Sequence, residues 1–244
     1  MALNLFKPLG SLLDFFLPRL CVFCRGAVSE GAAAAVCQAC QDQIQWVASP
    51  LCLRCGRVFG SKEGADRICG LCQKEPPPFV RARAAVLYDE DGPAASAIKQ
   101  FKYGRRMDML PVLQTWLRTP TFLEPAAAVD LLVPVPLHSR RLKERGFNQA
   151  LLLARAFPDQ PLARDALVRV RHTVPQSGLN PKERRENVKR AFAVPRAEQV
   201  KGKKIILVDD VYTTGATVKE CAKVLMKAGA REVQVLTVAR VRYE

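Results

Sequence analysis

The sequence predicts an α/β fold in which a parallel sheet carries helices on both faces, joined to a small cysteine-rich domain at the N-terminus. An unbroken aliphatic run at residues 205–208 is followed by two acids, a small-residue loop and apolar residues at helical spacing, the order of strand, loop and helix in a parallel sheet. Eight of the nine cysteines lie between residues 21 and 72. We therefore expect a cysteine-rich domain at residues 1–76 and an α/β domain at residues 79–244, separated by a stiff proline triplet at residues 76–78.

The composition fits a globular chain with one sizeable core and room for a small second domain. The chain has 244 residues, of which 49% are hydrophobic. Its formal net charge is +15, which favours anionic partners such as phosphates, nucleic acid or acidic lipid. The alternative is that the excess of lysine and arginine only keeps the surface soluble.

Residues 1–20 are apolar, but they lack the pattern of a signal peptide or a membrane span. Prolines and an acid interrupt the run, which is shorter than the ~20 residues that a spanning helix needs. We therefore expect a cytoplasmic protein without a membrane span. The spacing of the apolar residues predicts a short helix docked on its neighbour, with attachment to a membrane surface as the alternative. These residues are Leu9, Leu12, Leu13 and Phe16.

The N-terminal cysteines form four Cys-x-x-Cys pairs and an internal repeat, because residues 21–26 match residues 52–57. Such a pair places two thiolates on one tight turn, and two turns complete a tetrahedral zinc site. Disulfides and redox motifs fit less well in a reducing context. Two sequential ribbons, each with one structural zinc ion, are the simplest arrangement, and an interleaved pairing stays open. The expected ligands are Cys21, Cys24, Cys37, Cys40, Cys52, Cys55, Cys69 and Cys72.

Periodicity and proline positions predict the elements between these cysteines and the C-terminus. Val, Ile and Leu runs that break at prolines or acids indicate strands, and proline in a first turn indicates the start of a helix. We expect strands at residues 83–88, 131–136 and 232–239, helices at residues 93–103, 108–117 and 150–157, and a loop at residues 120–125.

A basic loop at residues 138–149 follows the second of these strands. Cations after a strand end can bind a phosphate group, and Arg145 is the preferred ligand because the following Gly-Phe-Asn-Gln begins a helix that fixes its position. The alternative is a solvated basic helix start. Residues 169–192 are polar and turn-rich over a length that favours a functional or mobile loop. The candidate ligands of the basic loop are Arg140, Arg141, Lys143 and Arg145.

The acids and the small-residue loop after residue 208 suit a sugar phosphate. Asp209 and Asp210 follow the strand at the edge where α/β sheets bind ligands, and they can accept hydrogen bonds from vicinal hydroxyls. The loop exposes backbone amides at a helix start, where a phosphate monoester is favoured, and the lysine of a nucleotide-binding P-loop is missing. The alternative is a buried strand capped by solvated acids. The loop consists of Thr213, Thr214, Gly215, Ala216 and Thr217.

Residues 209–217 resemble the phosphoribosyl pyrophosphate (PRPP) signature of type I phosphoribosyltransferases. Over nearly its whole length, the sequence is similar to the ComF family. The likeness is carried by the cysteines and by Phe-Lys-Tyr at 101–103, Val-Pro-Val-Pro at 133–136, Arg-Gly-Phe-Asn-Gln at 145–149, Thr173 with Gln176, Arg184 with Asn187, and Ala-Phe at 191–192. The resemblance implies a type I phosphoribosyltransferase-like domain with a zinc-binding N-terminal region. It also implies a role in DNA uptake during natural transformation, with single-stranded DNA and other DNA-uptake proteins as partners.

Two functional hypotheses follow. In the first, the protein is a PRPP-binding phosphoribosyltransferase: Mg²⁺ bridges pyrophosphate and ribose hydroxyls, Asp209 and Asp210 hold the ribose, and the small-residue loop binds the 5-phosphate. Arg145 and its basic neighbours stabilise the departing pyrophosphate. No hood for a purine or pyrimidine is recognisable, which leaves the acceptor open. In the second, the protein is a non-catalytic single-stranded DNA-binding protein that uses the same pocket as a PRPP sensor.

Overall fold

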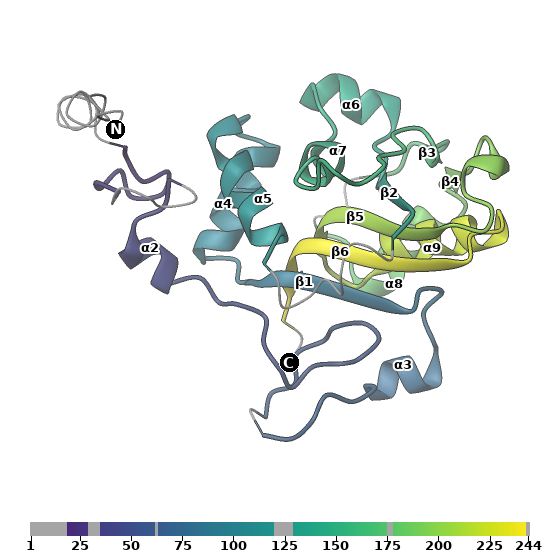
Figure 1. The fold of residues 1–244 in the computed structure, drawn as a ribbon, viewed down its shortest axis with the longest axis horizontal. Helices are drawn as coiled ribbons and strands as arrows, with labels where there is room; N and C mark the ends of the chain where they lie inside the picture. The colour runs from purple at the N-terminus through teal and green to yellow at the C-terminus, as the bar shows by residue number, and fades with distance from the viewer. Residues whose placement is uncertain (1–18, 29–34, 62, 120–128, 175–177, 243–244) are drawn as a thin grey trace, which may run out of the picture.

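The computed structural model describes residues 19–28, 35–61, 63–119, 129–174 and 178–242 (Figure 1). Within these residues the main sheet has four strands in the order β1-β6-β5-β2, and every neighbouring pair is parallel. The predicted parallel sheet is therefore confirmed. The predicted N-terminal helix and the loop at residues 120–125 lie outside the described residues. The strands are β1 (Arg81–Tyr88), β2 (Leu131–Pro134), β5 (Lys204–Tyr212) and β6 (Glu232–Val241).

The central strand β5 is longer than its aliphatic run. Residues 205–210 are all buried, as a strand covered on both faces requires. The sequence predicts that the strand ends at the acids, but the ladder with β6 continues, since Asp209 pairs with Thr237 and Tyr212 pairs with Arg240. The acids therefore lie among the last residues of β5, where the ladder with β6 fixes the backbone geometry.

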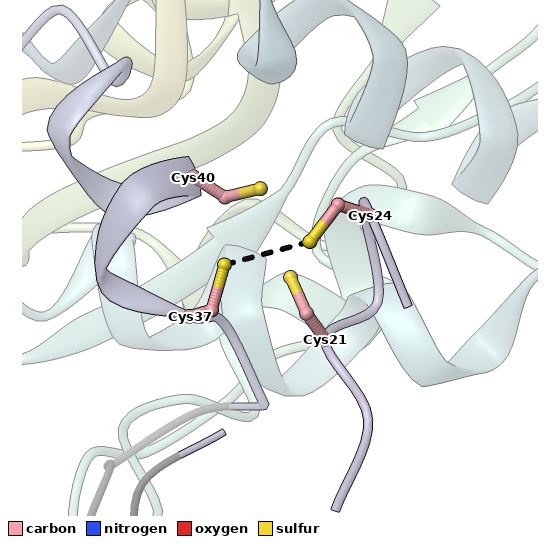
Figure 2. A group of neighbouring side chains, drawn as sticks. All are labelled: Cys21, Cys24, Cys37 and Cys40. Atoms are coloured by element: carbon pink, nitrogen blue, oxygen red, sulfur yellow. Dashed lines mark hydrogen bonds between the residues drawn. The ribbon is translucent and has the colours of Figure 1, made fainter. Parts of the chain in front are cut away.

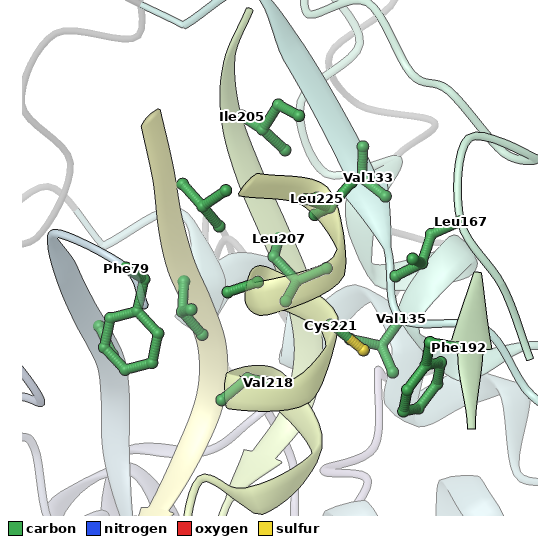
Figure 3. Close-up of a cluster of buried hydrophobic side chains, with 14 of the residues drawn as sticks. Phe79, Val133, Val135, Leu167, Phe192, Ile205, Leu207, Val218, Cys221 and Leu225 are labelled. Carbon is green, nitrogen blue, oxygen red and sulfur yellow. The ribbon is translucent and has the colours of Figure 1, made fainter. Parts of the chain in front are cut away.

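Helices cover both faces of the sheet (Figure 1). One face packs against α4 (Pro93–Lys102), α5 (Leu110–Leu117) and α7 (Gln149–Ala154), through a cluster that includes Phe101 and Trp116. The other face packs against α9 (Ala216–Lys227), as Figure 3 shows around Leu207 and Leu225, and α8 (Pro181–Val188) packs against α9. The short antiparallel pair β3 (Val168–Arg169) and β4 (Phe192–Ala193) borders the α9 side, where Phe192 joins the same cluster. Three-residue 3₁₀ turns are found at Met107–Met109 and Ala197–Gln199.

Two segments predicted as loops contain helices. Residues 138–145 form α6 (Ser139–Arg145), because His138 Nδ1 accepts the Arg140 N–H at 3.3 Å and Gly146 ends the helix at φ 86°. Residues 181–188 form α8, which Asn180 and Glu183 start with a capping box. Both segments are rich in charged residues and therefore lack the apolar periodicity that predicts a helix. Their capping residues, His138 and Gly146 for α6 and Asn180 for α8, would have indicated the helices.

The cysteine-rich region packs on the sheet as two separate modules. The first, with α2 (Gln38–Asp42), joins the cluster of α4 and α5, and the second, with α3 (Gly70–Lys74), joins the cluster of α9. The segment between them pairs with the outer edge of β1: the Val47 N–H donates to the Ala85 carbonyl at 2.9 Å, and the Leu87 N–H donates to the Gln45 carbonyl at 2.7 Å. This segment covers an edge strand that would otherwise expose its hydrogen-bonding groups. In the described part of the chain, no helix combines the length and apolar character needed to cross a membrane.

Candidate functional site

A cleft of about 490 Å³ opens at the carboxyl ends of the strands, where parallel α/β sheets bind their ligands. Its walls come from the ends of β1, β5 and β6, from the segment after β2, from β3, α4, α6, α7 and α8, and from the start of α9. Of the phosphate and sugar ligands that the sequence predicts, the following line the cleft: Asp209, Asp210, Thr213, Gly215, Ala216, Thr217 and Arg141.

The two acids point to opposite faces of β5, because consecutive strand residues alternate. Asp210 faces α4, where its Oδ1 accepts from Lys102 Nζ at 2.8 Å, while its buried Oδ2 has no partner among the described residues. Asp209 lies on the other face and accepts the Asp210 N–H at 2.9 Å. Burial, together with the negative charge of Asp210, raises the pKa of Asp209 to about 7. In their ionised form, the carboxylate oxygens of both acids can accept hydrogen bonds from hydroxyls or from the water shell of a divalent cation.

The loop after the acids has the geometry of an anion site. Gly215 adopts φ 75°, which lets the chain turn sharply into α9, a helix of 12 residues whose first residues, Ala216, Thr217 and Val218, line the cleft. Thr214 does not line the cleft, since its hydroxyl accepts the Ala216 N–H at 3.3 Å and closes the turn. Thr213 and Thr217 therefore supply the hydroxyls at the cleft surface.

Only one of the four predicted cations of α6 lines the cleft. Arg141 does so, whereas Arg140 and Lys143 are exposed on the helix surface. Arg145 lies one layer behind: it donates to Gln149 Oε1 at 2.6 Å and stacks over the Tyr103 ring at 5.4 Å, and both partners line the cleft. Because these residues form a helix rather than a loop, they cannot all turn to the same side.

Four further cations line the cleft: Lys99, Lys102, Arg169 and Arg184. Burial lowers the pKa of Arg169, and its buried Nε has no partner among the described residues. The Arg184 Nε donates to the Leu179 carbonyl at 2.8 Å. Lys102 stands at the end of the amphipathic helix α4 and in the Phe-Lys-Tyr segment that carries part of the family likeness. For Arg169 the sequence gives no signal beyond its place at the start of a polar segment.

The cysteines form two clusters, each with four sulfurs, among the described residues. In each cluster all sulfurs lie within 4.8 Å of one another; Cys24 and Cys37 are 3.5 Å apart (Figure 2), and Cys55 and Cys69 are 3.8 Å apart. A tetrahedron with Zn–S bonds of ~2.3 Å separates its sulfurs by about 3.8 Å, so the residues fit structural zinc. The pairing is sequential, which excludes the interleaved alternative: Cys21, Cys24, Cys37 and Cys40 form one cluster, and Cys52, Cys55, Cys69 and Cys72 the other.

Backbone amides favour thiolates in both clusters. Cys52 Sγ accepts the N–H groups of Cys55 at 3.4 Å and Cys69 at 3.3 Å. Although burial opposes ionisation, these donors lower the pKa of Cys52 to about 7, and donors in the first cluster lower the pKa of Cys21 to about 6 in the same way. One thiol of each cluster thus favours the anionic form that binds a metal ion, whereas burial and the neighbouring thiols raise the pKa of Cys40 to about 12 and raise the pKa of Cys72.

The fold and the cleft define a phosphoribosyltransferase-type α/β domain that carries two zinc ribbons. The double zinc ribbon domain model matches residues 12–73, and the phosphoribosyl transferase domain model matches residues 142–243. Competence protein F of Haemophilus influenzae is 32% identical over 94% of this chain and 100% of its own length. The DNA utilization protein YhgH of Escherichia coli K12 is 34% identical over 92% and 98%, and the competence protein ComFC of Bacillus subtilis is 25% identical over 84% of each chain. The chain belongs to the ComF family.

Proposed function

We propose that this protein binds PRPP with Mg²⁺ in the cleft and acts as a phosphoribosyltransferase-type protein in the uptake or use of DNA. The observation that carries the proposal is the arrangement of a buried acid pair beside a glycine turn at the start of a 12-residue helix. The names of the relatives, a competence protein F and DNA utilization proteins, support the DNA part of the proposal.

Each part of the ligand has a matching group in the cleft. Amides and hydroxyls of residues 213–217 receive the 5-phosphate, and the helix dipole of α9 adds to the attraction. Asp209 and Asp210 accept hydrogen bonds from the ribose hydroxyls. Arg141, Arg169 and Arg184 come from three different elements and border the remaining space, where they stabilise the pyrophosphate charge. Bound Mg²⁺ would offset part of the pyrophosphate charge during departure. Arg145 acts behind them by holding Gln149 and Tyr103 in place.

Calorimetry with Mg²⁺ and PRPP tests this proposal. We expect the Asp210→Asn variant to bind PRPP roughly ten- to more than a hundredfold more weakly, because losing a charge-assisted contact costs about 1.5 to 3 kcal/mol. Asp165→Asn is the matched control, since Asp165 is an exposed acid that pairs with Arg196 and lies outside the cleft lining. Unchanged affinity in an Asp209→Asn, Asp210→Asn double variant would place the sugar elsewhere.

A second candidate function is single-stranded DNA binding with the cleft as a PRPP sensor. The exposed cations that do not line the cleft favour it, since Arg140 and Lys143 on α6 and Lys182 and Arg185 on α8 face solvent. Binding to a DNA backbone should fall with salt at a log-log slope of about −0.7 per phosphate neutralised. Pyrophosphate release with a panel of acceptors separates the two candidates: release that depends on an acceptor supports the transferase, and PRPP binding without release supports the sensor.

A further inference from the structure

Arg240 is a buried cation between the second cysteine cluster and the cleft. Only 2% of this residue is exposed, although it lies near the end of β6. Its Nη1 donates to the Cys55 carbonyl at 2.7 Å, on the turn that carries the first two thiols of that cluster. The guanidinium also lies 5.1 Å from the centre of the Tyr212 ring. The side chain therefore bridges the second ribbon and the end of β5.

Tyr212 in turn packs against the glycine of the phosphate loop. A Cβ atom at Gly215 would lie 2.3 Å from Tyr212 Oη and 2.6 Å from Cζ, so the phenol ring fills the space beneath that turn. Tyr212 is 5% exposed, and Gly215 adopts the left-handed conformation that begins α9. The ring thus supports the turn whose residues line the cleft.

We propose that Arg240 is a positioning residue that couples the second ribbon to the phosphate loop. The inference rests on the proposed function only in taking residues 213–217 as the phosphate site. A buried guanidinium must keep its acceptor and its ring contact, because a buried charge without partners is strongly unfavourable. The Cys55 carbonyl accepts a hydrogen bond from the guanidinium, the guanidinium lies over the Tyr212 ring, and Tyr212 packs against the turn at Gly215. The ribbon thereby contributes to ligand affinity without contacting the ligand.

The two halves of the ligand distinguish a positioning role from a merely structural one. We expect the Arg240→Met variant to bind ribose 5-phosphate at least tenfold more weakly while its affinity for Mg²⁺-pyrophosphate stays unchanged, because only the first ligand uses the braced loop. The matched control is Arg83→Met. Arg83 Nη1 also donates to a carbonyl of the second ribbon, that of Leu53 at 3.1 Å, but among the described residues the cation over the Tyr212 ring is Arg240 and not Arg83. Arg83→Met should leave both affinities unchanged.

Calorimetry with each ligand is combined with hydrogen exchange of the amides at residues 213–217. If these amides exchange faster in Arg240→Met but not in Arg83→Met, the coupling between Arg240 and the phosphate loop is detected without any ligand. The inference is overturned if the exchange rates of Arg240→Met are unchanged and its affinities for the two ligands either fall equally or do not fall at all. If Arg240→Met does not fold, Arg240→Lys and Tyr212→Leu are measured in its place, with the same selective loss expected. If the unmodified protein binds neither ribose 5-phosphate nor PRPP, the proposed function fails, and the exchange data alone decide the coupling.

Discussion

At the scale of single residues, the chemistry of the cleft depends on the different surroundings of two adjacent acids, Asp209 and Asp210. Asp210 is paired with Lys102 across the gap to α4, whereas Asp209 is buried on the opposite face of the strand. Side chains alternate between the two faces of a strand, and this alternation produces the asymmetry. Neither the composition nor the motif predicts which group faces each acid. Two predictions follow from the two environments.

The first prediction concerns pH and the stability of the free protein. The pKa of Asp209 is about 7 in the folded chain, against about 3.9 in an unfolded one, so the folded state keeps a proton in the range between these values. Stability should therefore fall as pH rises from about 4 to 7, by an amount on the order of a few kcal/mol. Asp209→Asn should melt at a higher temperature than the unmodified protein at pH 8 and at a similar temperature at pH 4. Differential scanning calorimetry without divalent cations measures this, and parallel melting curves across the pH range would contradict it.

The second prediction concerns Lys102, which is only 17% exposed in its side chain. Lys102→Met should lower the free energy of unfolding by about 3 to 5 kcal/mol, because it leaves Asp210 buried without its cation. Urea denaturation measures the change. The double variant with Asp210→Asn should recover much of the loss. As a control, Lys189→Met breaks an exposed pair with Glu186 and should cost at most about 1 kcal/mol.

At the scale of elements, the strand, turn and helix at residues 204–227 form the unit on which the site is built. The turn depends on Gly215, which combines a positive φ with close contact to Tyr212. In helix α6, by contrast, the backbone turns most of the candidate cations away from the site: they are distributed around the helix, and of the four only Arg141 lines the cleft. Backbone conformation therefore decides which of the candidate groups face the ligand.

Gly215→Ala tests the turn. Gly202 provides a matched control, because it has nearly the same φ, 72° against 75°, but nothing within 4 Å of an added Cβ. Gly202→Ala should cost about 1 to 2 kcal/mol for the left-handed backbone alone. Gly215→Ala should cost more, because the ring of Tyr212 must move, and it should also weaken PRPP binding. Denaturant titration and calorimetry measure both effects, and equal costs for the two variants would mean that Tyr212 does not support the turn.

At the scale of the whole molecule, the cysteine clusters and the sheet share their apolar cores. The second cluster packs with Phe79 and the α9 side, and the first packs with the α4 and α5 side, where Phe23 stacks on Trp116. Because each ribbon contributes little apolar sequence, we expect metal binding to supply much of its folding energy.

Metal analysis of the freshly reduced protein should find two zinc ions per chain. Cys52→Ser should leave one and should shift a single unfolding transition of the whole chain to lower temperature, because the second cluster packs into the core of the sheet. Cys221→Ser is the control: Cys221 is a buried residue of α9, outside both clusters, and the variant should retain two ions. One ion or none in the unmodified protein would remove the double-ribbon model.

The sequence by itself determined the parallel sheet, the strand, turn and helix of the site, and the thiol pairs, because each follows from spacing within a few consecutive residues. It also contained the caps of α6 and α8, although their charged residues concealed those helices. Only the tertiary structure decided that the thiol pairs combine sequentially, that Lys102 meets Asp210, and that Arg240 reaches a carbonyl 185 positions away. These contacts join segments far apart in the chain, and their geometry is set by how the layers pack, which local periodicity does not encode.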